Sequence, residues 1–253
     1  MHQPGRYIPS DSPKIDAHAH VGAFGSWCGV SVGAEEMCEI MARLGVKRTI
    51  ISHPDNRTTL EAQRRRPDQF AALAWLNPAD GETAVHKLVE LAEAKQIQGL
   101  KLHPLFNAFV ADDECVFPLV EAAQKRDLPI FVHSGHPPFS LPWSIGQLAE
   151  RFPAARFVMV HMGHGHGVYI QAAIETARRR ENIWLENSGM PMPGKILEAC
   201  RRVGSERLFW GSDAPFHRHE AEMLRTEVSG LAPSELEKVF YGNIKAFMGW
   251  RDI

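Results

Sequence analysis

The feature that most constrains the fold is an alternation, repeated eight times, of apolar strand-like runs with amphipathic helical stretches. The strand-like runs are residues 14–20, 46–53, 70–76, 98–103, 128–133, 156–161, 182–186 and 207–211. Most are nearly continuous in apolar character, which is typical of strands buried on both faces. The helical stretches, with apolar residues three or four positions apart, are residues 34–44, 58–65, 82–95, 114–126, 145–151, 169–179, 194–203 and 219–227. The pattern predicts a parallel sheet covered by helices.

Eight such units in 253 residues favour a closed (β/α)8 barrel, or TIM barrel, whose usual size is about 250 residues. The rival is an open doubly wound sheet, in which a GxGxxG turn follows the first strand; here that turn holds His18, His20 and Gly22. No linker or low-complexity tract divides the chain. We therefore expect one α/β domain over residues 1–253, with its first strand from about residue 14 and an extra C-terminal helix at about 234–250.

The composition limits the kinds of partner that we expect this chain to bind. The 28 Lys and Arg residues nearly balance 30 Asp and Glu, and no segment gathers the cationic block that a nucleic acid or an anionic membrane requires. We expect a small-molecule partner, no nucleic acid, no membrane contact, and a homodimer as the common default. Four widely spaced cysteines without CxxC spacing, and an N-terminus with no apolar signal core, favour a cytoplasmic protein.

Unusual polar residues fall at the carboxyl ends of the expected strands, where a barrel assembles its active site. They share one level of the barrel and are His18, His20, Lys101, His103, His133, His161 and Asp213. His18 and His20 alternate along the first strand, so both side chains can point toward one ion. Imidazoles and a carboxylate at one level predict a divalent metal, Zn²⁺ first, with Mn²⁺ or Fe²⁺ as alternatives. Asp213 is placed to take a proton from a metal-activated water.

Further pocket residues are expected on the loops beyond the strands. His136 follows the fifth strand and His164 the sixth, whereas His103 ends the fourth. Trp143 and Phe216 could add an apolar wall. We predict that these five residues contact the substrate.

Six motifs in order resemble the amidohydrolase superfamily, in its amidohydrolase-related branch of metal-dependent hydrolases and decarboxylases. They are DAHAH at 16–20, KLHP at 101–104, the single histidines His133 and His161, GSDAPF at 211–216 and YGNI at 241–244. The resemblance covers about residues 15 to 243. It implies that the metal ligands are His18, His20, His133 and Asp213. It also implies that His161 binds a second metal or contacts the substrate and the activated water, so Asp213 and His161 are the expected catalytic residues.

The residue at the position of Lys101 differs between the groups of enzymes in this superfamily. Members similar to dihydroorotase and phosphotriesterase carry a carboxylated lysine that bridges two metals, and GLKLHP around Lys101 resembles that context. We therefore expect Lys101 among the ligands of one or two ions; a cationic Lys101 paired with Asp213 or with a substrate carboxylate is the alternative. Decarboxylases of the branch usually bind one metal without such a lysine, so Lys101 favours hydrolysis.

These features predict a metal-dependent hydrolase that opens an ester, lactone or amide of a small carboxylated molecule. The first alternative is a metal-dependent, non-oxidative decarboxylase of the same branch. The second is a non-catalytic barrel that binds a metabolite, against which the intact ligand set argues.

Overall fold

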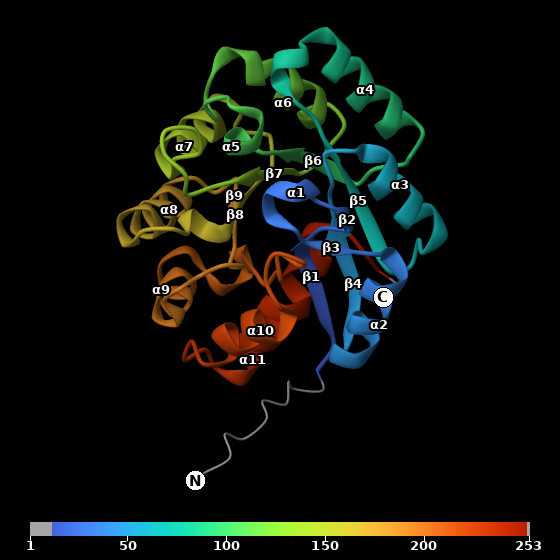
Figure 1. The fold of residues 1–253 in the computed structure, drawn as a ribbon. Coiled ribbons are helices and arrows are strands. Elements are labelled where there is room, and N and C mark those ends of the chain that lie inside the picture. The colour runs from blue at the N-terminus through green and yellow to red at the C-terminus, as the bar shows by residue number, and fades with distance from the viewer. Residues whose placement is uncertain (1–11, 252–253) are drawn as a thin grey trace.

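The computed structural model describes residues 12–251 and shows eight parallel strands ringed by helices (Figure 1). The strands are β1 (Lys14–Ala19), β4 (Val46–Ile51), β5 (Phe70–Trp75), β6 (Gly99–Leu102), β7 (Ile130–His133), β8 (Phe157–Val160), β9 (Ile183–Glu186) and β10 (Leu208–Phe209). They pair in this order. Backbone hydrogen bonds from Ala17 N to Trp210 O and from Asp213 N to His18 O join the chain after β10 to β1. The predicted (β/α)8 barrel is confirmed.

Each strand is followed by the helix that the periodicity predicts. The helices are α2 (Ala34–Leu44), α3 (Asn56–Arg65), α4 (Glu82–Glu93), α6 (Phe117–Gln124), α7 (Pro142–Arg151), α8 (Gly167–Arg179), α9 (Pro193–Val203) and α10 (His219–Glu227). Local chemistry sets their ends: Asp55 accepts a hydrogen bond from Arg57 N at the start of α3, and Gly45 in the left-handed conformation ends α2. No helix within residues 12–251 has the length and apolar character that crossing a bilayer requires.

Shorter elements join these units. The 3₁₀ turns are η1 (Pro78–Asp80), η2 (Glu114–Val116), η3 (His161–Gly163) and η4 (Ser205–Arg207). After β1, an antiparallel pair, β2 (Gly22–Ala23) and β3 (Ser31–Val32), flanks the short helix α1 (Gly25–Cys28), and α5 (Pro104–Asn107) follows β6. The sequence did not predict these pieces, because a two-residue strand or a single helical turn has no measurable periodicity.

Two apolar layers hold the barrel together. One fills its interior and consists of Ile15, Ala17, Ile50, Ala71, Leu73, Phe131, Val158, Val160, Phe209 and Ile244. The other lies between the strands and the helices and includes Leu88, Leu100, Val132 and Ile174. Because side chains alternate along a strand, membership of one layer or the other shows which residues face the barrel axis.

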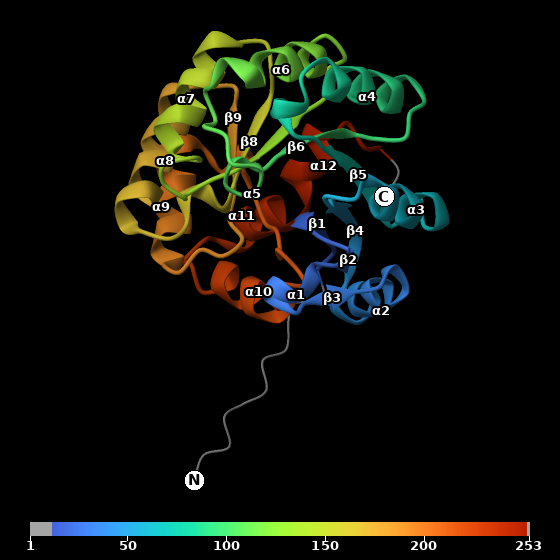
Figure 2. The same cartoon turned by 45° about the horizontal axis from the view of Figure 1, so that its top comes forward.

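The C-terminal segment closes the barrel at the amino ends of the strands. The expected helix is observed as α11 (Pro233–Glu237), a π-helical turn η5 (Lys238–Gly242) and α12 (Asn243–Phe247). Asn243 Nδ2 donates to the carbonyl oxygens of Ser205 and Leu208, which fixes α12 against the turn before β10. Ile244 then enters the interior layer beside Ile15, and Figure 2 shows α12 close to the barrel axis.

Candidate active site

A cavity of about 550 Å³ opens at the carboxyl ends of the strands. It is lined by His18, His20, Phe24, Trp75, His103, Leu105, Phe106, His133, His136, His161, His164, Asp213, Phe216 and His217. Lys101 is fully buried, with its Nζ 3.5 Å from His18 Nε2. Trp143 is not brought to this cavity: it lies in the first turn of α7 near Tyr169, is 47% exposed, and lines a separate surface depression against α8. The other predicted site residues meet here.

A register shift in β1 brings both of its histidines to the cavity. Ile15 and Ala17 face the interior, whereas Ala19 faces the helices. The shift lies between Asp16 and Ala19, so the alternation changes phase at this point. His18 and His20 therefore share the cavity face, as the sequence predicts.

His161 reaches the cavity through a left-handed turn rather than through strand alternation. Val158 and Val160 face the interior, so a continued strand would direct His161 outward. Instead, His161 and Met162 adopt φ values of 68° and 36°. This unusual backbone turns the ring of His161 back over the mouth of the barrel.

A buried carboxyl that sequence reasoning missed orients His161. Glu186 ends β9 and is fully buried; its oxygens accept hydrogen bonds from Ser188 N (2.6 Å), Ser188 Oγ (2.8 Å) and His161 N (3.1 Å). His161 Nδ1 is in turn hydrogen-bonded to Ser188 Oγ (2.8 Å), so Glu186 and Ser188 together hold the orientation of the His161 ring. An acidic residue at the end of a buried strand was the available signal. Gly211 leaves room for it, since a Cβ there would lie 2.4 Å from Glu186 Oε1.

A second buried carboxylate fixes the GSD segment after β10. Asp16 accepts hydrogen bonds from Ser212 N (2.8 Å), Ser212 Oγ (2.5 Å) and His18 N (3.1 Å). His219 Nε2 lies 3.3 Å from the same carboxylate. The hydrogen bonds between Asp16 and Ser212 tie the segment after β10 to β1. They set the position of the next residue, Asp213, whose φ is 53°.

The imidazole nitrogens and the carboxylate oxygen at the centre of the cavity are suited to bind a cation. His20 Nδ1–H donates to the Ser52 carbonyl oxygen (2.8 Å), so Nε2 of the neutral ring is a bare acceptor. That atom lies 3.2 Å from Asp213 Oδ1, which His18 Nε2 approaches to 3.3 Å. His18, His161 and Asp213 each place a donor atom within 4.8 Å of the other two. A carboxylate and unprotonated nitrogens this close favour a divalent metal between them.

The protonation states match that chemistry. Burial lowers the pKa of His18 to about 3 and holds that of His161 well below its usual range, so both rings are neutral near pH 7. Burial alone would raise the pKa of Asp213, but neighbouring imidazoles, His161 first, stabilise its charge and keep the pKa well below the usual value. Burial also lowers the pKa of Lys101 to about 8, against the opposing charge of Asp213.

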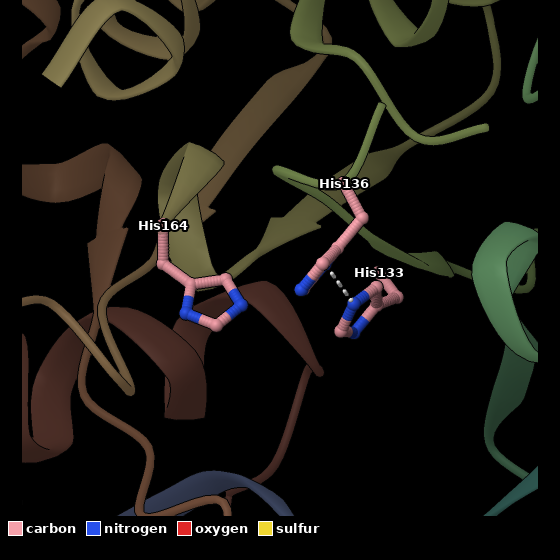
Figure 3. A group of neighbouring side chains, drawn as sticks. All are labelled: His133, His136 and His164. Atoms are coloured by element: carbon pink, nitrogen blue, oxygen red, sulfur yellow. Dashed lines mark hydrogen bonds between the residues drawn. The ribbon is translucent and has the colours of Figure 1, made fainter. Parts of the chain in front are cut away.

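A second set of histidines lies beside this cluster. Trp75, His103, His133 and His136 form a ladder of nearly parallel rings, with centroid separations of 4.9, 3.9 and 4.9 Å. Figure 3 shows His136 hydrogen-bonded to His133, with His164 facing the pair from the neighbouring loop. His103 Nδ1 accepts from Phe106 N (3.2 Å), so its Nε2 carries the proton of the neutral ring.

Comparison with known proteins shows which family shares this architecture. The amidohydrolase family model matches residues 15–250. Gamma-resorcylate decarboxylase of Polaromonas sp. strain JS666 is 22% identical over an alignment of 241 residues, and the match covers 72% of this chain and 71% of the relative. The structure of 2,6-dihydroxybenzoate decarboxylase from Rhizobium superposes with a TM-score of 0.76 at 16% identity, over 94% of this chain and 99% of the other.

A further structure holds a metal. It is the dihydroxybenzoic acid decarboxylase of Polaromonas sp. JS666 with bound manganese and the inhibitor 2-nitroresorcinol, with a TM-score of 0.72 at 16% identity, over 96% of this chain and 98% of the other. Together with the His/Asp cluster it supports a divalent metal cofactor. The sequence-based prediction of a hydrolase was wrong: the relative and the two solved structures compared above are decarboxylases, and the context of Lys101 did not determine the reaction.

Proposed function

Because this chain belongs to the amidohydrolase family, we propose that it is a metal-dependent decarboxylase that removes CO₂ from a hydroxylated aromatic acid. The observation that carries the proposal is the union of a His/Asp cluster with an aromatic wall in one cavity. Phe24, Trp75, Phe106 and Phe216 line the same space as Asp213. The decarboxylase relatives support this chemistry.

The resident ion would be held by His18, His20, His161 and Asp213. The resemblance implied His133 in place of His161, but the nitrogen that converges with His18 and Asp213 comes from His161. When bound, the ion would supply positive charge that holds and polarises the substrate carboxylate and a neighbouring hydroxyl. We propose Mn²⁺ before Zn²⁺, because the donor set includes a carboxylate and a relative contains manganese.

Asp213 is the proposed proton carrier. Decarboxylation of an aromatic acid replaces CO₂ by a proton on the same ring carbon, so a group that exchanges protons must reach that carbon. The Asp213 side chain is 13% exposed, at the wall of the cavity, and can take a proton from water that enters the mouth. Neutral His161 beside it would help to position the carboxylate.

The aromatic wall would orient the ring. Phe24 contacts Phe216 edge to face at 4.9 Å, and Trp75 lies opposite His20 at 6.0 Å between centroids. A flat apolar ring packs well against such faces. His103 Nε2–H would then donate to a ring hydroxyl or to the carboxylate. The small-molecule partner fits this proposal. A cytoplasmic location stays our prediction from the sequence, and a homodimer stays the default expectation.

The test uses 2,6-dihydroxybenzoate. Protein stripped with a chelator, then reloaded with Mn²⁺ or Zn²⁺, should release CO₂ and form resorcinol from this acid, or release CO₂ and form the corresponding phenol from another hydroxybenzoate in a panel. Removal of the metal should abolish turnover and its return should restore it. Metal-loaded protein that binds the acids but releases no CO₂ from any of them would refute the proposal.

A further inference from the structure

The cavity is also lined by His217, to which neither the sequence motifs nor the proposed function assign a role. This residue lies in the loop between β10 and α10, and its side chain is 34% exposed. We propose that His217 is a specificity-determining residue, whose ring forms a hydrogen bond with a hydroxyl group beside the carboxylate of the aromatic acid. This inference rests on the proposed decarboxylase and adds a substrate contact to it.

A buried carboxylate holds the His217 ring in place. Glu222 of α10 is 1% exposed, and its Oε1 lies 3.0 Å from His217 Nδ1. Arg225, one turn further along α10, forms an ion pair with the same carboxylate. A buried carboxylate is costly without partners, so these contacts help to keep Glu222 and His217 in one arrangement. Because the Nδ1 edge of the ring faces Glu222, Nε2 is the nitrogen that serves a ligand.

The same carboxylate joins α10 to the loop after β9. Glu222 Oε2 accepts a hydrogen bond from Gly189 N (3.0 Å). The ring of His217 packs on the backbone of Gly189, where a Cβ would lie 3.0 Å from His217 Cε1. His217 N also donates to the carbonyl oxygen of Asp213 (3.2 Å). His217 is thus fixed relative to the proposed proton carrier, and this preorganisation lowers the entropic cost of binding a substrate.

His217 and His103 approach the cavity from opposite sides. In the closed ring of eight strands, β6 and β10 are four positions apart in either direction. His103 directly follows β6, and His217 follows β10. Figure 1 shows α6 and α10, which come after these two strands, on opposite sides of the barrel. An aromatic acid whose carboxylate lies between the two histidines therefore presents one flank of its ring to each of them.

A hydroxyl group suits the position beside His217 because it can both donate and accept a hydrogen bond. A neutral ring with its proton on Nδ1, toward Glu222, accepts from the hydroxyl at Nε2, whereas a protonated ring donates to the hydroxyl oxygen. A C–H group at the same place can form neither bond. His217 therefore discriminates between an acid that carries a hydroxyl on this flank and one that does not.

Calorimetric titration of Mn²⁺-loaded full-length protein with two acids tests the inference. 2-Hydroxybenzoate can place its single hydroxyl at His103, whereas 2,6-dihydroxybenzoate has a second hydroxyl for His217. In His217→Leu, 2,6-dihydroxybenzoate should bind about tenfold more weakly, which is the value of about one hydrogen bond, and 2-hydroxybenzoate should change by less than about twofold. His217→Gln retains a polar group and should recover part of the loss.

The ratio of the two affinities is the quantity that decides. Each protein is compared on the same two acids, so their different acidities cancel from the change in this ratio. His86→Leu, on the exposed face of α4, is the matched control and should keep the wild-type ratio. Circular dichroism and Tm confirm that each variant is folded, and His217→Ala is used if leucine prevents folding. Equal losses for both acids, or an unchanged affinity for 2,6-dihydroxybenzoate, would overturn the inference.

These outcomes are distinct from those that test the proposed function. If both acids bind and the ratio changes as expected but no CO₂ is released, the decarboxylase is refuted and the contact with His217 stands. If CO₂ is released and the ratio is the same in His217→Leu, the contact is refuted and the decarboxylase stands. Wild-type protein that binds neither acid would refute both.

Discussion

The two ends of the barrel interior are built from the same strands but carry opposite chemistry. Toward the amino ends of the strands, Ile15, Phe131 and Val158 pack around Ile244 of α12 and are fully buried. At the carboxyl ends, imidazoles and a carboxylate occupy the corresponding space. Burial of apolar area stabilises the first end, whereas burial of ionisable groups costs free energy at the second. The difference teaches that stability and function can be changed separately in this molecule.

The largest expected effect is on activity, at the carboxyl end. Asp213→Asn keeps the shape of the side chain but removes its ability to carry a proton, so decarboxylation should fall by about 10²- to 10⁴-fold. Metal content and Tm are measured on the same preparation, to show that the variant still binds its ion and is folded. Asp80→Asn, at an exposed position on η1, is the control. Near-normal turnover by Asp213→Asn would exclude Asp213 as the carrier and point to His161.

The matching experiment at the amino end should affect stability alone. Ile244→Ala opens a cavity in the interior layer and should lower the free energy of unfolding by about 2–5 kcal/mol in urea titrations. Turnover per folded molecule should stay near the wild-type value at temperatures well below Tm. Val228→Ala, where the side chain is 60% exposed, should change neither quantity. A large loss of turnover in folded Ile244→Ala would show that the two ends are coupled.

The amino end of the barrel was the more predictable one. Its apolar strands and the helical periodicity around them gave the eight units, and the C-terminal helix was expected at 234–250 and observed from Pro233 to Phe247. The convergence of His18, His133 and His161 also followed from the order of the strands. The sequence could not predict the details of the backbone, because the register shift of β1 and the positive φ of His161 depend on tertiary contacts.

The reaction was less predictable than the site. The context of Lys101 favours hydrolysis, yet the relative and the two solved structures compared above are decarboxylases. The same set of metal ligands can serve hydrolysis or decarboxylation. The features that distinguish the two reactions lie in loops whose conformation the sequence does not show. Glu186 and Ser188 were missed because their role depends on hydrogen bonds between β9 and the turn after β8.

A smaller effect should appear when metal-free protein is acidified. Burial lowers the pKa of His164 to about 4 from an ordinary 6.5. Between these values the unfolded chain binds a proton that the folded chain excludes, so stability falls as the pH falls. His164→Gln removes this contribution and should lose less stability than the wild type between pH 6.5 and 4.5, by up to about 2–3 kcal/mol. His86→Gln serves as the surface control. Urea titrations at several pH values measure the difference, and identical acid profiles would contradict it.

The smallest expected effect has the opposite sign and comes from Glu186. Burial raises the pKa of its carboxyl from 4.5 to about 8, so the folded chain keeps a proton that the unfolded chain loses. Stability should therefore fall as the pH rises toward 8. The window from pH 6.5 to 8 separates this effect from that of His164, and there the contribution is at most about 2 kcal/mol. Glu186→Gln keeps an acceptor for the Ser188 hydroxyl but cannot titrate, so its stability should be flatter across the window. Parallel curves for the two metal-free proteins would mean that the Glu186 proton does not differ between the folded and unfolded states.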